Sequence, residues 1–239
     1  MSFKGVLKRI LFGEKADPDT YLSALRKKGM KIGRGVQLFA SPRDCVIDEQ
    51  NPYLLTIGDN VQLTRGVVIL THDYSWSVVK GLYGEVLGHQ APVIIGSNVF
   101  IGMNAIILCG STIGDNVIVG AGSVVSGSIP SNVVVAGNPA RVICDIDEYR
   151  EKRKGKQLSE ALKLYSCYRE RYGCEPEKEL FREYFWLFEK DGGSLCPEFW
   201  DVNSLVLPDV STKAFAEWNP RFDGYSDFLE YCRNGGNNE

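Results

Sequence analysis

The stretch from Val93 to Arg141 decides the fold: VIIGSNVFIGMNAIILCGSTIGDNVIVGAGSVVSGSIPSNVVVAGNPAR. A branched aliphatic residue returns at every sixth position, at Ile95, Ile101, Ile107, Ile113, Val119 and Val125. This period fits neither an isolated α-helix, with about 3.6 residues per turn, nor an alternating strand. It fits short strands joined by turns, and hexapeptide repeats of this kind are typical of parallel β-helices. We therefore predict strands that pair between stacked coils.

Small residues follow the aliphatic positions in a regular way. Glycine comes directly after four of them, at Gly96, Gly102, Gly114 and Gly120, and asparagine comes three places after three of the same four, at Asn98, Asn104 and Asn116. Both residue types reach positive φ at low cost, so we expect that conformation at these positions. Small residues there also allow neighbouring coils to approach closely.

The segment IGDNVIVGAGSVVSGSIPSNVVVAGNPARVI, with THD at residues 71–73 upstream, resembles the hexapeptide-repeat acyltransferases. In particular it resembles the sugar O-acetyltransferases similar to galactoside and maltose acetyltransferase, over residues 32–143. The resemblance implies a left-handed parallel β-helix with three strands per coil, a homotrimer, and acetyl-CoA as co-substrate. The left hand comes from the resemblance alone, because crossovers between parallel strands are otherwise right-handed.

Composition bounds the possible functions. The chain has 239 residues, 44% of them hydrophobic and 24% charged, which suits one sizeable core and a smaller second unit. Its net charge of -3 lacks the basic excess of a nucleic-acid-binding protein, so we expect no such partner. Seven cysteines without CxxC pairs indicate free thiols in a reducing cytosol. The N-terminal stretch resembles no signal peptide, and no run approaches about 20 apolar residues, so we expect a cytoplasmic protein.

Residues 1–31 are predicted to form short helices. The first is amphipathic over residues 3–11, with Phe3, Val6, Leu7, Ile10 and Leu11 on one side and Lys4, Lys8 and Arg9 between them. It packs on its own domain or a neighbouring subunit, or it makes a weak contact with a membrane surface. Asp17 and Pro18 predict the start of a second helix over residues 19–28, which Gly29 ends.

The β-helix is predicted over residues 32–144, with two interruptions. The six-residue phase is lost between Leu38 and Ile57, which are 19 residues apart, and we expect irregular coil edges there. Ile95 follows Ile69 by 26 residues, which is one step of six plus an insertion of 20. We therefore predict a loop at residues 72–92 that is extruded from the β-helix, and long loops in compact scaffolds are usually functional or disordered.

Residues 145–239 are predicted to form a C-terminal α-helical appendix. Helical spacing extends from Leu158 to Tyr172, with Asp145 or Asp147 as the cap, and Pro176 begins a second helix with an aromatic stripe. A last helix is expected at residues 225–232. Such a stripe is more typical of a core than of a cofactor site.

His72 is the candidate catalytic residue. Transfer of an acetyl group from a thioester to a hydroxyl needs a base that works near neutral pH, which histidine supplies. The chain has two histidines, and His72 stands at a coil edge where the family's catalytic histidine stands, before the loop. His89 is interpreted as structural. We expect direct transfer without an acyl-enzyme, with Asp44, Asp48 or Glu85 as candidates to orient His72.

The resemblance also implies binding residues. Asp44 falls where related enzymes carry a polar residue that faces the acceptor, or it is a solvated turn carboxylate. Trp76 and Tyr83 lie against a sugar ring or only fix the loop. The donor contacts carried over by position are Met103 and Ala121 through the main chain, Ser126 and Gly127 at the following turn, and Arg141 near the nucleotide phosphates.

The chain departs from many relatives at three positions. It has Phe100 in place of tryptophan, Gly127 in place of a basic residue, and Cys144 in place of a second arginine. Two positive charges are lost, so we expect weaker binding of the coenzyme A phosphates unless another subunit or the helical appendix supplies cations.

Three alternatives remain open or are excluded on chemistry. A zinc enzyme like the γ-class carbonic anhydrases would need three histidines, and this chain has two that are 17 residues apart, so no metal is expected. A non-catalytic β-helix scaffold would not need a loop that begins at a coil-edge histidine. Among acceptors, the hydroxyl of a sugar or surface polysaccharide is preferred to an amino sugar, a drug or serine.

Overall fold

The computed structural model describes residues 3–190 and 195–236, and side chains from residue 7 onward in the N-terminal helix. The chain divides into two compact units, Met1–Tyr149 and Arg150–Glu239, which are described one at a time. No helix among the described residues is long and apolar enough to cross a membrane.

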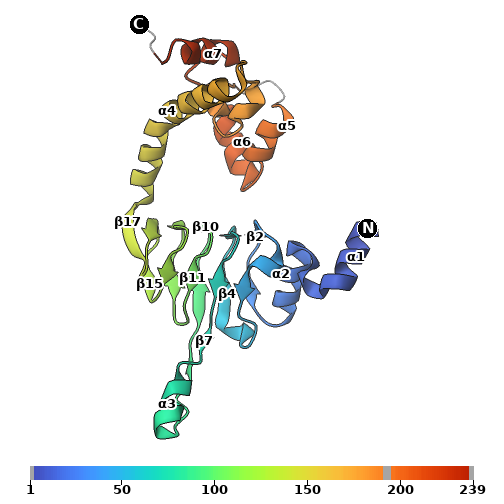
Figure 1. The fold of residues 1–239 in the computed structure, drawn as a ribbon, viewed down its shortest axis with the longest axis vertical. Coiled ribbons are helices and arrows are strands. Elements are labelled where there is room, and N and C mark those ends of the chain that lie inside the picture. Colours follow the sequence, from blue (N-terminus) through green and yellow to red (C-terminus); the bar gives the residue numbers. More distant parts are fainter. Residues whose placement is uncertain (1–2, 191–194, 237–239) are drawn as a thin grey trace. The chain divides into compact units, whose positions relative to one another are not determined.

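The first unit is a parallel β-helix whose short strands stack into three sheets (Figure 1). One sheet contains β1 (Lys31–Ile32), β4 (Leu55–Ile57), β9 (Val93–Ile95), β12 (Thr112–Ile113) and β15 (Ser128–Ile129). The next contains β2 (Gln37–Leu38), β5 (Gln62–Leu63), β10 (Val99–Ile101), β13 (Val117–Val119), β16 (Val133–Ala136) and β17 (Arg141–Asp145). The third contains β3 (Val46–Ile47), β6 (Val68–Ile69), β11 (Ile106–Ile107) and β14 (Val124–Val125). The predicted fold class, a left-handed parallel β-helix with N-terminal helices and a C-terminal helical region, is confirmed.

The repeated aliphatic side chains form three buried columns. Parallel register stacks Ile32, Ile57, Ile95, Ile113 and Ile129 in the first column. The second column consists of Leu38, Leu63, Ile101, Val119 and Val135. The third consists of Ile47, Ile69, Ile107 and Val125. Together with neighbouring valines and alanines they form one core cluster, so each coil contributes an aliphatic layer.

The turn residues divide their roles differently from the prediction. Asn98, Asn104 and Asn116 have φ of 55°, 58° and 56°, as predicted. The glycines after the aliphatic residues do not have positive φ, and the expectation for them was wrong. A Cβ on Gly102 would lie 2.6 Å from the backbone nitrogen of Ala121. Glycine is therefore needed at these positions because neighbouring coils approach closely, and not because of positive φ.

Helix α2 (Pro18–Lys27) closes the N-terminal end of the stack. Asp17 caps it as predicted, because its Oδ1 accepts the backbone N–H of Thr20 at 2.9 Å. Its buried residues Tyr21, Leu22 and Leu25 belong to the core cluster of the β-helix. The helix therefore covers the apolar face that the first coil would otherwise expose.

Helix α1 (Phe3–Phe12) precedes it, joined by a 3₁₀-helix (Gly13–Ala16). The side chains of residues 3–6, and thus the predicted apolar contacts of Phe3 and Val6, lie outside the described part. Ile10 is 75% exposed and Leu11 64% exposed, so the first unit does not cover these two side chains. Arg43 lies over the Phe12 ring, with 3.8 Å between its Cζ and the ring centroid.

Strand β17 ends the stack at the other side. It pairs antiparallel with β16, with Ala136 opposite Arg141 and Val133 opposite Asp145. The chain thus reverses direction on the last coil instead of starting another parallel strand.

The extruded segment contains regular secondary structure where a loop was predicted. Strands β7 (His72–Asp73) and β8 (His89–Gln90) pair antiparallel as a stem, and helix α3 (Trp76–Tyr83) lies at its end (Figure 1). Gly84 ends the helix in the left-handed region, φ 77°, with its N–H on the carbonyl of Lys80. The irregular edges expected before Ile57 contain two 3₁₀-helices (Pro42–Asp44 and Pro52–Leu54) and β3.

The second unit has an aromatic core. Helix α4 (Ile146–Tyr172) begins just before the unit boundary and is followed by 3₁₀-helices (Lys178–Phe181 and Phe185–Leu187), α5 (Pro197–Asn203), α6 (Pro208–Ala216) and α7 (Tyr225–Arg233). The first and last predicted helices are confirmed, whereas the α-helix predicted after Pro176 is wrong, since 3₁₀ turns occupy that segment. The fully or nearly fully buried phenylalanines are Phe181, Phe185, Phe188, Phe199, Phe215, Phe222 and Phe228.

Candidate active site

His72 stands where the chain leaves the β-helix. The strand β6 ends at Ile69, which is fully buried, and the N–H of Leu70 still bonds to the carbonyl of Ile107 in the next coil at 3.0 Å. Thr71 is also fully buried, and His72 directly after it has 16% of its side chain exposed. The imidazole is therefore fixed to a rigid edge.

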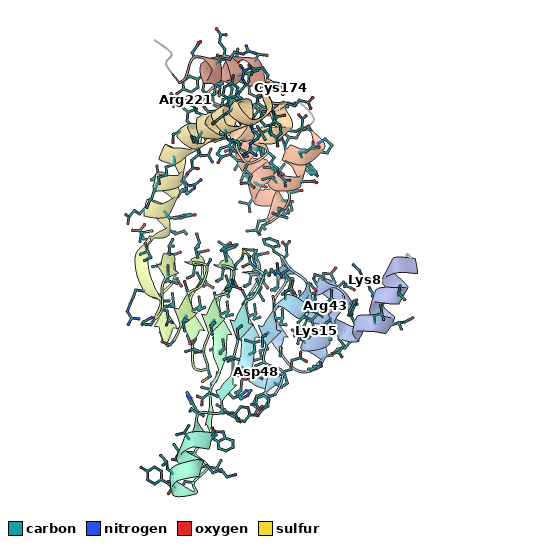
Figure 2. The ribbon with its side chains drawn as sticks, viewed as in Figure 1. Lys8, Lys15, Arg43, Asp48, Cys174 and Arg221 are labelled. Atoms are coloured by element: carbon teal, nitrogen blue, oxygen red, sulfur yellow. The ribbon has the colours of Figure 1, made fainter. Side chains whose placement is uncertain are left out.

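Asp48 holds the imidazole. Its Oδ2 lies 2.5 Å from Nδ1 of His72. Asp48 directly follows β3, and Leu70 directly follows β6. Because Ile47 stacks on Ile69, Asp48 and Leu70 occupy the same corner of the β-helix in adjacent coils, and His72 lies two residues further along. Figure 2 shows Asp48 where the projecting hairpin meets the β-helix.

The environment of Asp48 keeps it ionised. Burial raises the pKa of its carboxyl, but hydrogen bonds from Thr71, Gln50 and His72 outweigh burial and lower the pKa below its usual value. Oδ2 accepts the backbone N–H of Thr71 at 2.9 Å and its hydroxyl at 2.5 Å, and Oδ1 accepts the N–H of Gln50 at 2.9 Å. An ionised carboxylate only accepts hydrogen bonds, so Nδ1 of His72 carries a proton, and in the neutral tautomer that this contact selects the lone pair is on Nε2.

The other two candidates to orient His72 are engaged or placed elsewhere. Asp44 lies in the 3₁₀-helix before β3, and its Oδ2 lies 3.6 Å from Nε of Arg65. Glu85 is exposed in the loop after α3. Of the three carboxylates considered from the sequence, Asp48 is the one that contacts the imidazole.

Aromatic side chains line the exit of the stem. The ring of Tyr74 meets His72 edge-on, with 4.9 Å between centroids, and its hydroxyl donates to Gln50 at 2.9 Å. Trp76 is half-buried next to Tyr74, with 5.8 Å between ring centroids, whereas Tyr83 is 73% exposed at the far end of α3. Tyr74 was not singled out from the sequence, although its position two residues after His72 in an extended segment indicates a shared face.

The residues implied for the donor occupy two corners of the β-helix. Met103 and Ala121 follow strands of the second sheet, and the carbonyl of Met103 accepts the N–H of Gly122 at 2.7 Å, so their turns are stacked. Ser126 and Gly127 follow β14 of the third sheet, at the same corner as His72, which follows β6. These four residues are exposed.

Arg141 begins β17 and is also exposed. Its guanidinium donates to the carbonyl of Ala140 at 3.0 Å. One chain thus spreads the predicted donor residues over separate edges of the β-helix and over its last strand.

Comparison with known proteins agrees with this architecture. Residues 92–127 match the family described as bacterial transferase hexapeptide (six repeats). Protein CapG of Staphylococcus aureus is 43% identical over 128 residues, which cover 54% of this chain and 73% of that protein. Galactoside O-acetyltransferase of Escherichia coli (strain K12) is 38% identical over 138 residues, which cover 57% of this chain and 64% of that protein. A crystal structure of a maltose O-acetyltransferase from Clostridium difficile 630 is 30% identical, covers 60% of this chain and 84% of that chain, and has a TM-score of 0.46.

The chain belongs to the hexapeptide-repeat acyltransferases. Within that family it is similar to the galactoside and maltose O-acetyltransferases, and it is an acyltransferase.

Proposed function

We propose that the protein transfers an acetyl group from acetyl-CoA to a hydroxyl of a sugar or a surface polysaccharide, with His72 as general base. The observation that carries this proposal is the contact between Nδ1 of His72 and the buried carboxylate of Asp48. This contact fixes the tautomer of an imidazole at the base of the extruded loop, in a chain that belongs to an acyltransferase family.

The proposed reaction is a direct transfer. Nε2 of His72 takes the proton of the acceptor hydroxyl while the oxygen attacks the thioester carbonyl carbon. Backbone N–H groups stabilise the oxyanion of the tetrahedral intermediate. When the intermediate collapses, the C–S bond breaks and the imidazolium returns its proton to the thiolate. The negative charge of Asp48 stabilises the imidazolium in between, which is why its ionised state matters.

Acetyl-CoA would be bound by backbone groups near Met103 and Ala121, by the turn at Ser126 and Gly127, and by the guanidinium of Arg141. Because one chain places these groups at separate edges, a groove between two adjacent β-helices is needed to bring a complete donor site to one His72. The guanidinium of arginine is always protonated and can donate two parallel hydrogen bonds to a phosphate, which suits this contact.

We infer a homotrimer on the same grounds. The extruded segment has apolar side chains that its own chain leaves uncovered, since Val78 is 68%, Leu82 72% and Leu87 61% exposed. Surfaces of this kind favour contact with another protein surface. A neighbouring subunit is the partner that would also complete the donor groove.

The acceptor site is proposed around the stem exit. Trp76 lies beside Tyr74, which meets His72, and would support the flat face of a sugar ring. Tyr83 of the loop and Asp44 would reach an acceptor from their own chain or from a neighbouring subunit. We place the reaction in the cytoplasm, where seven free thiols are kept reduced. The exposed residues of α1 would make a weak contact with a membrane surface or contact another subunit.

The test is an acceptor panel assayed by release of the coenzyme A thiol, with three variants. His72→Ala should lower kcat by about 100-fold to 10,000-fold, because the base is lost. Asp48→Asn should lower kcat strongly with little change in acceptor KM. An amide at this position sets its NH₂ group against an N–H donor in either orientation, since both carboxylate oxygens accept hydrogen bonds.

Asp115→Asn is the matched control for the second variant. Asp115 is also a turn carboxylate that accepts a backbone N–H, from Ser97 at 2.6 Å, but it lies away from His72 in another turn. It should leave kcat unchanged. Retention of most activity in His72→Ala would place the base elsewhere, activity on amines alone would make the protein an N-acetyltransferase, and absence of coenzyme A binding would favour a scaffold.

A further inference from the structure

The stem of the extruded loop has two faces, and only one of them serves His72. Strands β7 and β8 pair so that Asp73 lies directly opposite His89. Side chains of directly opposed residues in a hairpin share one face, and the next pair in register, His72 and Gln90, shares the other. The face with Asp73 and His89 is therefore independent of the contact between His72 and Asp48.

This second face meets a cysteine from the β-helix. Cys109 lies in the turn between β11 and β12, and its Sγ is 3.5 Å from Nδ1 and 3.7 Å from Nε2 of His89. The same turn packs on the stem base, because a Cβ on Gly110 would lie 3.5 Å from Cβ of Ala91. Nδ1 of His89 is also 2.6 Å from Oδ2 of Asp73. One carboxylate oxygen, one imidazole nitrogen and one sulfur thus lie within 4.8 Å of one another.

We propose that Asp73, His89 and Cys109 form a binding site for a divalent metal ion of the zinc type, with one ligand each from the two strands of the stem and from the next coil. Zinc binds carboxylate oxygen, imidazole nitrogen and thiolate sulfur, and three protein ligands leave a fourth position for water. Tetrahedral bond lengths for zinc place nitrogen and sulfur about 3.6 Å apart, close to the separation of Nδ1 and Sγ. Because Sγ is almost as close to Nε2, the imidazole must turn to direct the lone pair of Nδ1 at the ion. The carboxylate oxygen needs to retreat by less than about 1 Å to reach its own ligand position.

The ligand groups are oriented by contacts around them. The other carboxylate oxygen of Asp73 accepts the backbone N–H of Ser75 at 2.9 Å and its hydroxyl at 2.6 Å. Such outer contacts are typical of metal ligands because they fix the ligand's direction. They also lower the pKa of Asp73 to about 2, so the carboxylate is ionised.

Binding would change the state of the cysteine. Burial and the charge of Asp73 raise the pKa of the Cys109 thiol, so the free protein carries it protonated. A metal–sulfur bond forms as the S–H bond breaks, and the proton passes to solvent. The ion would fasten both strands of the stem to the coil beside them, and so hold the loop that carries Trp76 and Tyr83.

The first test is binding of Zn²⁺ and Co²⁺ to the full chain, reduced and stripped with a chelator. The unchanged protein should bind one ion per chain, and Co²⁺ should produce the charge-transfer band of a cobalt–thiolate bond. Cys109→Ser should abolish the band and weaken zinc binding by at least about tenfold. Cys196→Ser is the matched control, because Cys196 lies with Glu179 and Glu198 in a second group of metal-ligand atoms in the helical unit.

The second test uses the fact that the chain has two histidines. With ring-nitrogen labelling, the NMR signals of His89 should shift on addition of Zn²⁺ while those of His72 keep their position, and His89→Gln assigns them. A band that survives Cys109→Ser, a band lost in Cys196→Ser, or a zinc shift confined to His72 would each overturn the proposal. These results do not depend on acetyl transfer, so they are separate from the test of the proposed function.

Discussion

The two units of this chain build their cores in opposite ways. The β-helix repeats one layer, in which strands such as β6, β11 and β14 each add an aliphatic residue to a column. The helical unit gathers phenylalanines from the 3₁₀ segments and from α5, α6 and α7 into one cluster without any common spacing. The stability of the first unit therefore depends on how closely the backbones of neighbouring coils can approach one another. The stability of the second depends on the burial of a few large aromatic side chains.

The largest effect is expected from Phe228→Ala in the helical unit. Phe228 is fully buried, and its ring centroid lies 4.9 Å from that of Phe181 and 5.0 Å from that of Phe188. Its loss should lower the free energy of unfolding of this unit by about 3–5 kcal/mol. Tryptophan fluorescence during denaturation measures it well, because three of the four tryptophans, Trp186, Trp200 and Trp218, belong to this unit.

Val210→Ala is the control for that measurement. Val210 is 64% exposed on α6, so its truncation should change the free energy of unfolding by no more than about 0.5 kcal/mol. A loss below about 1 kcal/mol for Phe228→Ala would show that the aromatic cluster is not the centre of this unit.

A medium effect is expected from adding one methyl group to the β-helix. In Gly102→Ala the new Cβ would lie 2.6 Å from the nitrogen and 2.9 Å from Cα of Ala121, and 2.8 Å from the carbonyl oxygen of Val119. All three are backbone atoms, so two coils must separate, and we expect a loss of about 1–3 kcal/mol. Thermal unfolding followed by circular dichroism gives the value.

Gly155→Ala makes the same chemical change in the other unit, with the opposite sign. Gly155 lies inside α4, and an added Cβ meets nothing within 4 Å, so the change should stabilise the helix by about 0.5–1 kcal/mol. Equal effects of the two substitutions would remove the contrast between layered and clustered cores.

The smallest of the three destabilising effects concerns the asparagine ladder of the β-helix. Nδ2 of Asn98 donates to Asn116, and Nδ2 of Asn116 donates to Asn132, both at 2.8 Å. Asn116→Ala loses these bonds and places alanine at φ 56°, so we expect a loss of about 1–2 kcal/mol. Asn116→Gly keeps the backbone conformation accessible and should recover part of it in the same measurement. No recovery would assign the whole loss to the hydrogen bonds.

Repetition explains how much of the fold could be predicted. Ile95, Ile101 and Ile107 are six residues apart and belong to three different columns. This regular spacing predicts both the strands and their stacking. Ile47 stacks on Ile69 although the two are 22 residues apart, because the turns between them contain extra residues. That lost phase also concealed Asp48, which the sequence alone could name only as one of three carboxylates.

Features formed by a few unlike residues were harder to predict. The aromatic spacing after Pro176 suits an α-helix, yet packing of Phe181 and Phe185 into the common cluster is met by 3₁₀ turns instead. The proposed donor residues other than Arg141 lie on turns that the repeat does predict, but the proposed groove that would bring them together needs a second chain. Histidine number and spacing argue against a three-histidine metal site, but they do not test a group of ligand atoms taken one each from three segments, such as Asp73, His89 and Cys109.

The N-terminal end of the stacked coils is sealed by the buried side of α2, and at the other end β17 pairs antiparallel with β16, the last parallel strand of one sheet. An open end would present unpaired backbone groups and apolar side chains to the next molecule, which is the geometry that lets β-structures grow into fibres. The cap of α2 closes the N-terminal end of the stack to growth of this kind. His72 and the extruded hairpin lie on a flank of the stack, so the proposed contact between copies and the proposed acetyl transfer would share that flank.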